Sequence, residues 1–283
     1  MDTEAMDSVE LSQGTITYRA AGPADSAHPP VVFVHGILVD NQLWTAVADK
    51  LAEGGYRSYA PNLPLGSHRQ AMKPDADLSP RGVAGMINDF MAKLGLTNVT
   101  LVGNDTGGAL CQFLIDTDHS RIGRLVLTNC DAFDVFPPRD FKPLFIAAKR
   151  QALIKPLAAS IKPTALRHSR LGYGLLFARK PDPAITSSWI TPALTDTQVR
   201  RDIAKLMRAI HPKDLLDVST RLKAFDKPVR IVWGAADTSF RLSLGERLAA
   251  TFPHAKLTHI EGGKTFVSME FPDEVAEAIG EAS

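Results

Sequence analysis

Short apolar runs alternate with longer amphipathic stretches along the first half of the chain. The runs are typical of buried strands, and the amphipathic stretches have the period of surface helices. Strands are predicted at residues 15–20, 30–35, 56–61, 98–103 and 124–128. Helices are predicted at residues 42–51, 80–94 and 107–117, the second with Ser79 as its N-cap. This order predicts βαβ units and a parallel sheet with helices on both faces.

The alternation stops at about residue 134, and a different pattern holds to about residue 223. This segment has no strand-like apolar run, and nine prolines divide it into short helical pieces. Afterwards, strands are predicted at 228–233 and 256–261, and helices at 242–250 and 272–279. We therefore predict an α/β core of residues 1–133 and 224–283, interrupted by a helical cap of residues 134–223.

Composition fits a globular protein and excludes several other classes. The 283 residues are 45% hydrophobic and 22% charged, which is enough for a sizeable core and unlike a disordered or fibrous chain. A formal net charge of +1 gives no reason to expect a nucleic-acid partner. The two cysteines, Cys111 and Cys130, lie in apolar runs, so neither a disulfide framework nor a cysteine-based zinc site is predicted. No cofactor or metal is expected.

The sequence gives no sign of membrane insertion or export. No run approaches about 18 apolar residues, so we expect no membrane span. The N-terminus is acidic and polar, without the basic and apolar blocks of a signal peptide. The cytoplasm is therefore the predicted location, although a leader already removed from the chain would leave the same pattern.

Charge divides unevenly between the two parts of the chain. Residues 142–223 hold 16 Lys and Arg against 5 Asp and Glu, while the rest holds 16 against 26. One interpretation is that basic helices dock on an acidic core and solvate their outer faces. The other is that the basic segment attracts anionic substrates or an acidic surface, in which case added salt should weaken binding.

The segment 103–108, Gly-Asn-Asp-Thr-Gly-Gly, is the strongest candidate for chemistry. It follows a predicted buried strand and opens a predicted helix, and its Gly103 and Gly107 flank Asp105 in the spacing of a nucleophile elbow. Glycine suits such a turn because the backbone is strained and its neighbours pack closely. The elbow would present the Asp105 carboxylate at the carboxyl end of the sheet. We expect the helix N-terminus and nearby N–H groups to keep it ionised.

With this elbow, the chain resembles the α/β-hydrolase superfamily over essentially its whole length. His35-Gly36 matches the family's oxyanion-loop motif, and 233–237, Trp-Gly-Ala-Ala-Asp, matches the strand end that carries its acid. The resemblance implies an α/β-hydrolase fold, with a mostly parallel sheet flanked by helices and a helical cap inserted after the sixth strand. An Asp at the elbow is similar to the haloalkane dehalogenase, haloacetate dehalogenase and epoxide hydrolase branch. There the carboxylate forms an ester with the substrate, which activated water hydrolyses.

The resemblance also implies roles for individual residues. Asp105 would be the nucleophile, and the backbone N–H groups of Ile37 and Thr106 would form the oxyanion hole. Asp237 would orient a base. Asp131, which follows another strand, is an alternative position for that acid.

The histidine expected in the closing motif of the family is missing. Residues 260–267 read Ile-Glu-Gly-Gly-Lys-Thr-Phe-Val, and alignment on Phe266 puts Thr265 at the histidine position. A threonine hydroxyl does not take a proton from water near pH 7, so the general base is absent. His259 is the alternative base, although it falls in the last predicted strand. His35 is predicted to be structural, holding its loop.

Several marks of the named subfamilies are also absent. Haloalkane dehalogenases have Trp after the nucleophile and haloacetate dehalogenases have Arg, but here the residue is Thr106. Epoxide hydrolases have Pro two residues after His-Gly, where this chain has Leu38, and two cap tyrosines, where it has Tyr173 alone. Six cap residues are predicted to line a substrate pocket: Phe145, Leu153, Leu175, Leu176, Phe177 and Trp189.

The resulting functional prediction is a hydrolase that acts through Asp105 on a small, partly apolar substrate with an incomplete catalytic triad. Asp105 would attack the substrate or act as general base on a bound water. The alternative is a non-hydrolytic protein on this fold, either a ligand-binding protein or a lyase or isomerase that uses Asp105 as acid and base. The sequence specifies neither the substrate nor the oligomeric state.

Overall fold

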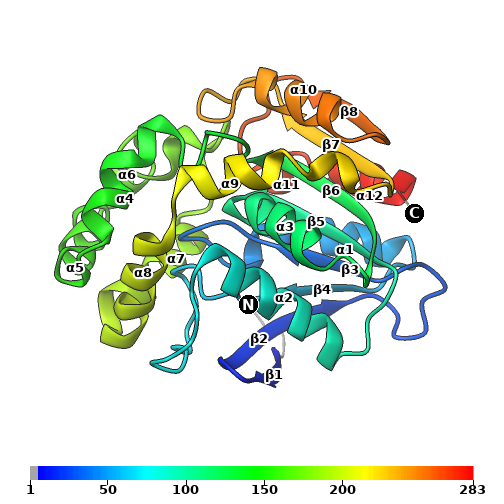
Figure 1. Cartoon of the computed structure of the whole chain (residues 1–283). Helices are drawn as coiled ribbons and strands as arrows, with labels where there is room; N and C mark the ends of the chain where they lie inside the picture. The colour runs from blue at the N-terminus through cyan, green and yellow to red at the C-terminus, as the bar shows by residue number, and fades with distance from the viewer. Residues whose placement is uncertain (1–5, 283) are drawn as a thin grey trace.

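A single eight-stranded sheet forms the centre of the protein, seen here in a computed structural model that describes residues 6–282 (Figure 1). The strand order is β1-β2-β4-β3-β5-β6-β7-β8, and all pairs are parallel except β1–β2 and β2–β4. The strands are β1 (Asp7–Leu11), β2 (Gly14–Ala21), β3 (Val31–Val34), β4 (Ser58–Pro61), β5 (Val99–Asp105), β6 (Ile122–Cys130), β7 (Val229–Gly234) and β8 (Ala255–Ile260). The mostly parallel sheet is as predicted; only β1 is additional.

Helices cover both faces of this sheet. They are α1 (Thr45–Glu53), α2 (Pro80–Lys93), α3 (Thr106–Thr117), α10 (Leu242–Thr251), α11 (Val267–Glu270) and α12 (Pro272–Ala282). Helices α1, α11 and α12 pack together on one face, while α2 and α3 pack together on the other, where α10 also contributes to the core. The N-cap of α2 is Ser79, as predicted, since its side chain accepts a hydrogen bond from the Gly82 N–H.

The central strands are apolar on both sides because both faces of the sheet are covered. In β3, the side chains of Val32 and Val34 join one core cluster, and those of Val31 and Phe33 join the other. Successive side chains of a strand point to opposite faces, so a strand buried on both must be apolar throughout. This explains the unbroken apolar runs in the sequence.

The segment between β6 and β7 is helical, as predicted. Its elements are η2 (Arg139–Phe141), α4 (Lys142–Ala148), α5 (Gln151–Ser160), α6 (Thr164–Arg167), η3 (Tyr173–Leu175), α7 (Pro183–Thr195), α8 (Thr197–Ala209), α9 (Pro212–Ser219) and η4 (Leu222–Ala224). Helices α4 to α8 form a separate group beside the sheet, at the left of Figure 1. Helix α9 packs against α3 of the core, and the precise boundary between core and cap stays a prediction.

Buried polar contacts fasten the cap to the core. The indole N–H of Trp189 in α7 donates to Asp40 Oδ1 at 2.8 Å. The carboxylate of Asp202 in α8 accepts from the Met72 N–H at 2.8 Å and lies 3.3 Å from the buried ring of His68. Each of these groups would lose its partner if the cap detached, so the contacts favour a fixed cap position.

Within residues 6–282, no helix is both long and apolar enough to cross a membrane. The absence of a signal peptide was predicted from the N-terminal residues. Residues 1–5 of that segment lie outside the described part of the chain.

Candidate active site

The backbone at Asp105 has the strained geometry of a nucleophile elbow. Asp105 ends β5 with φ 53° and ψ −132°, and α3 begins at the next residue. A Cβ atom at Gly107 would overlap the carbonyl oxygens of Val34 and His35, and one at Gly36 would overlap the Asp105 carboxylate. These two positions therefore require glycine, because strand β3 and its following loop pass directly beside the elbow. Gly103 is also crowded, because a Cβ atom there would meet Cys111 Sγ and the Gly108 Cα.

Two backbone N–H groups hold the Asp105 carboxylate. The Ile37 N–H donates to Oδ2 at 3.2 Å, and the Thr106 N–H also bonds this carboxylate. Burial nevertheless raises the pKa of Asp105 to about 7, and the two N–H groups offset only part of this effect. The expectation that the carboxylate stays fully ionised is therefore wrong, because desolvation outweighs the hydrogen bonds.

Asp237 and Thr265 form a closed hydrogen-bonded pair. The Thr265 hydroxyl donates to Asp237 Oδ2 at 2.7 Å, and the Asn129 amide donates to the same oxygen at 2.9 Å. The other oxygen accepts from the N–H groups of Ser239 and Phe240 at 2.8 and 3.0 Å. Both side chains of the pair are buried. The carboxylate is thus satisfied by four donors without a histidine.

None of the eight histidines of the chain, all within residues 6–282, lines the pocket that Asp105 faces. His35 is buried, donates from Nδ1 to the Gly36 carbonyl at 2.9 Å and accepts from the Leu63 N–H at 2.9 Å. Burial lowers its pKa to about 4, so the ring is neutral and fixed between two loops. His259 lies on β8 with its side chain 56% exposed and 3.6 Å from Glu261. The structure therefore does not bring this alternative base to Asp105.

Asp131 is fully buried beside the elbow. Its Oδ2 accepts from the Thr106 hydroxyl at 2.9 Å, and its N–H donates to the Asp105 carbonyl at 3.3 Å. Its Oδ1 has no hydrogen-bond partner within residues 6–282. Burial, together with the nearby charge of Asp105, raises the pKa of Asp131 well above its usual range. Within residues 6–282, the Asp131 carboxylate thus bonds the elbow residue Thr106 and no histidine, and its role as an alternative acid stays a prediction.

Two asparagines that the sequence analysis did not single out hold these parts together. The Asn104 amide donates to the Thr265 carbonyl at 2.7 Å and to the Thr128 hydroxyl at 2.8 Å. Asn129 bonds both Gly234 and Asp237. A polar residue at the inner end of an otherwise apolar strand is the signal that could have identified them, because a buried amide needs partners there.

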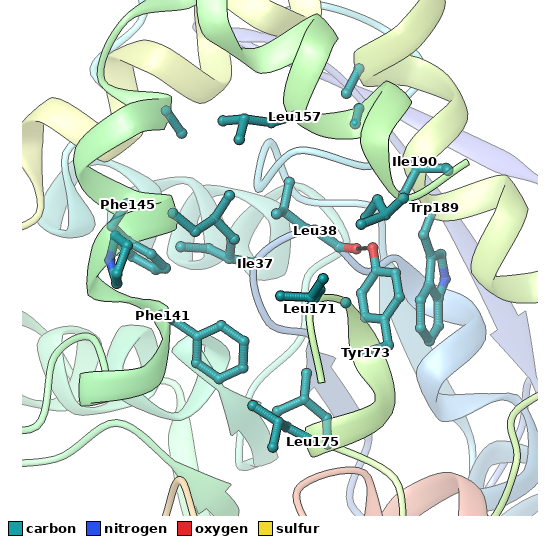
Figure 2. A pocket seen from close by; sticks show the side chains of 18 of the residues that line it. Ile37, Leu38, Phe141, Phe145, Leu157, Leu171, Tyr173, Leu175, Trp189 and Ile190 are labelled. Carbon is teal, nitrogen blue, oxygen red and sulfur yellow. Dashed lines mark hydrogen bonds between the residues drawn. The ribbon is translucent and has the colours of Figure 1, made fainter. Parts of the chain in front are cut away.

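A pocket of about 590 Å³ lies between the cap and the elbow (Figure 2). Its apolar lining includes Ile37, Leu38, Phe141, Phe145, Ile154, Leu157, Leu171, Leu175, Leu176, Trp189, Ile190 and Met207. Of the six predicted lining residues, Phe145, Leu175, Leu176 and Trp189 line it. Leu153 is instead 40% exposed on the cap, and Phe177 packs between Trp189 and Phe266.

Several polar side chains near this pocket already have partners. The Tyr173 hydroxyl donates to the Leu38 carbonyl at 2.6 Å, as the dashed line in Figure 2 shows. The Thr106 hydroxyl and the Trp189 indole are used by Asp131 and Asp40. Neither Asp237 nor Thr265 lines the pocket. Asp105 is thus the carboxylate presented at its inner end, while Asp140 and Arg170 line it from the cap segment. Across residues 6–282, no three His, Cys, Asp or Glu side chains gather as a metal site would require.

Comparisons with known proteins give a family match and several distant likenesses. A protein-family model described as alpha/beta hydrolase fold matches residues 29–272. Haloalkane dehalogenase 2 of Mycobacterium tuberculosis is 25% identical over 283 aligned residues, covering 95% of this chain and 92% of that protein. An alpha/beta hydrolase fold protein from Burkholderia ambifaria superposes with a TM-score of 0.78 at 23% identity, over 97% of each chain. The enol-lactonase from Burkholderia xenovorans LB400 superposes with a TM-score of 0.71 at 18% identity, over 95% of this chain and 96% of that chain.

Proposed function

The chain belongs to the α/β-hydrolase fold family, and from this premise we propose that it is a hydrolase in which the Asp105 carboxylate reacts with a small, partly apolar substrate. The division into a core of residues 1–133 and 224–283 and a cap of residues 134–223 is part of the proposal. The supporting observation is the position of Asp105. It combines a strained elbow, two backbone N–H donors and direct access to an apolar pocket.

The arrangement supports attack by Asp105 on a substrate carbon. The N–H groups of Ile37 and Thr106 fix the carboxylate, so that it can meet a substrate held by the cap. Attack on a saturated carbon would form an ester between Asp105 and the substrate as the bond from that carbon to the halogen or epoxide oxygen breaks. Attack on the acyl carbon of an ester or lactone would form a mixed anhydride as the bond to the alkoxy oxygen breaks. When water then attacks the ester carbonyl, the same N–H groups would stabilise the oxygen that becomes negative.

The second step of this route lacks its usual base. Thr265 stands beside Asp237, and neither reaches the pocket. General-base assistance typically accelerates such a step 10²–10⁴-fold, so hydrolysis of the ester should be slow and the ester should accumulate. The incomplete triad therefore predicts a detectable covalent intermediate.

A second role for Asp105 is favoured by its pKa of about 7. A carboxyl group that is about half ionised near neutral pH can both accept and donate a proton. It could act as general base on a bound water, or transfer protons in a lyase or isomerase reaction. These routes need no histidine, and only the second is non-hydrolytic.

The pocket is poorly equipped to stabilise a departing halide ion. The Trp189 indole N–H is used by Asp40, and the Thr106 and Tyr173 hydroxyls also have acceptors. We therefore propose that carbon–halogen bonds are poor substrates for this pocket.

Turnover in ¹⁸O-labelled water separates the proposed routes. The probes are 1-chlorohexane, 1,2-epoxyhexane, p-nitrophenyl butyrate and γ-octalactone, with Asp105→Asn as the control. The ester route puts ¹⁸O into the Asp105 peptide in a single turnover, whereas the general-base route labels only the product. Intact mass detects an ester that does not turn over. Absence of turnover and of adduct with all four probes would favour the non-hydrolytic alternative.

A further inference from the structure

A second cavity, of about 650 Å³, lies next to the apolar pocket. Its walls come from the segment after β6, the cap segment before η3, and the segment from the end of β7 into α10. Asp140 and Arg170 line both cavities. The two cavities are therefore neighbours, and one ligand can extend from Asp105 outward into the second. We call this second cavity the arginine cleft.

Positive charge is concentrated in the arginine cleft. Its charged lining residues are Arg139, Arg170, Arg241, Arg247, Asp134 and Asp140. Arg247 lies 3.3 Å from Asp134, and its guanidinium lies 3.7 Å from the centre of the Phe133 ring. In the part of the chain that the structure describes, the other three guanidinium groups have no hydrogen-bond or ion-pair partner. The cleft thus offers donors in excess of its own acceptors.

The first turn of α10 adds to this excess. Arg241 is the N-cap of this ten-residue helix, and no side chain caps its first N–H groups. Ser243 and Leu244 of the first turn line the cleft. A helix N-terminus carries a partial positive charge and free N–H donors, so it favours an anion at the same place as the arginines.

We propose that the arginine cleft binds the carboxylate or phosphate end of an amphipathic ligand whose apolar chain lies in the pocket that leads to Asp105. Guanidinium groups suit both anions because their paired N–H donors match two oxygens at once. An apolar pocket beside a cationic cleft fits an aliphatic chain with an anionic end better than a wholly apolar or a wholly charged molecule. Whether this ligand is also a substrate rests on the proposed role of Asp105. Binding of its anionic end in the arginine cleft does not depend on that role.

Calorimetric binding of matched eight-carbon probes tests this site without any turnover. The probes are octanoate, octyl phosphate, octan-1-ol and octyltrimethylammonium, with inorganic phosphate as an anion without a chain. We expect the two anionic probes to bind at least about tenfold more tightly than the alcohol, equivalent to ~1.4 kcal/mol. The cation should bind more weakly still. The preference should shrink as salt is raised, because exposed charges are screened.

Two double variants, each of which removes two positive charges, test whether the anion binds in the arginine cleft. Arg139→Gln with Arg241→Gln, at two positions that line the arginine cleft but not the apolar pocket, should remove most of the anion preference and leave octan-1-ol binding unchanged. Arg150→Gln with Lys155→Gln removes the same charge from exposed cap positions that line neither cavity, and should retain the preference. All four side chains are exposed, so folding should be unaffected.

Three outcomes would overturn the proposal. They are equal binding of octanoate and octan-1-ol, an equal loss in both double variants, and binding of inorganic phosphate that the octyl chain does not strengthen. The last result would mean a site for free anions only. Binding of octanoate and octan-1-ol to Asp105→Asn tests the arginine cleft independently of the proposed reactivity of Asp105. Retained anion preference there supports the arginine cleft even if Asp105 proves not to be catalytic.

Discussion

Two carboxylates at the same edge of the sheet lie in opposite environments. Asp105 ends β5 and faces the apolar pocket, and within residues 6–282 its carboxylate bonds backbone N–H groups only. Asp237 follows β7, accepts from four donors, and does not line that pocket. The surroundings of Asp105 leave its carboxylate accessible to a ligand in the pocket, whereas those of Asp237 hold its carboxylate in a closed hydrogen-bond network.

The contrast shows which role of the family's histidine the Thr265 hydroxyl can take over beside Asp237. Thr265 satisfies Asp237 Oδ2 at 2.7 Å, which preserves the buried polar network. It cannot carry a proton between water and Asp237 near neutral pH. A threonine therefore meets the structural requirement of this site without its proton-transfer chemistry.

The largest expected effect comes from removing the reactive carboxylate. Asp105→Asn keeps the shape of the side chain but cannot form an ester or take up a proton, so turnover should fall by about 10³-fold or more. Turnover is measured with the best of the four probes, and circular dichroism confirms the fold. Full activity in a folded variant would mean that the reaction does not use this region.

Restoring a base in the second region should have the next largest effect. Thr265→His would place an imidazole beside Asp237, and ester hydrolysis should accelerate by about 10²–10³-fold. The rate should follow a group with a pKa of ~6.5, because neutral imidazole is the base. Rapid-quench mass spectrometry measures decay of the Asp105 adduct. An unchanged decay rate in a folded variant would show that this position cannot serve the pocket.

The pH dependence of stability tests the unusual environment of Asp105. Its folded-state pKa is raised from 3.8 to about 7, so the folded protein holds this proton more tightly than the unfolded chain. Its contribution to stability is full below pH ~4 and is lost as pH rises through about 7, with a loss of roughly 1–3 kcal/mol. Urea unfolding of the wild type and Asp105→Asn from pH 4 to 8 measures the difference. Parallel stability curves would mean that the carboxyl group has an ordinary pKa.

The sequence was sufficient to predict the sheet, the elbow and the cap, because each has a strong local signal. Apolar runs identify doubly covered strands, and glycines at 103 and 107 mark a turn that tolerates no Cβ. Strand β1 was missed because its residues, Asp-Ser-Val-Glu-Leu, lie at the sheet edge and are mostly polar or exposed.

Other properties depend on contacts between distant segments and had no local signal. The ionisation of Asp105 was predicted wrongly because its desolvation depends on a complete pocket, which segments from 37 to 207 build together. The arginine cleft likewise gathers residues from 134 to 247. The charge split drew attention to the cap, but two of the four arginines in the cleft, Arg241 and Arg247, belong to the predicted core.

The smallest expected effect on turnover comes from removing the Thr265 hydroxyl, which distinguishes a structural from a catalytic role for this residue. Thr265→Val keeps the shape but removes the donor to Asp237 Oδ2, leaving that oxygen with the Asn129 amide alone. Loss of a buried partner typically costs about 1–3 kcal/mol, so the free energy of unfolding should fall by this amount. Turnover should stay within about twofold of wild type, since the threonine hydroxyl contributes no proton transfer. Thr265→Ser retains the donor and serves as the control, with stability closer to wild type. A large loss of turnover in Thr265→Val with little loss of stability would show instead that this hydroxyl takes part in the reaction, and the two carboxylate regions would then form one catalytic unit.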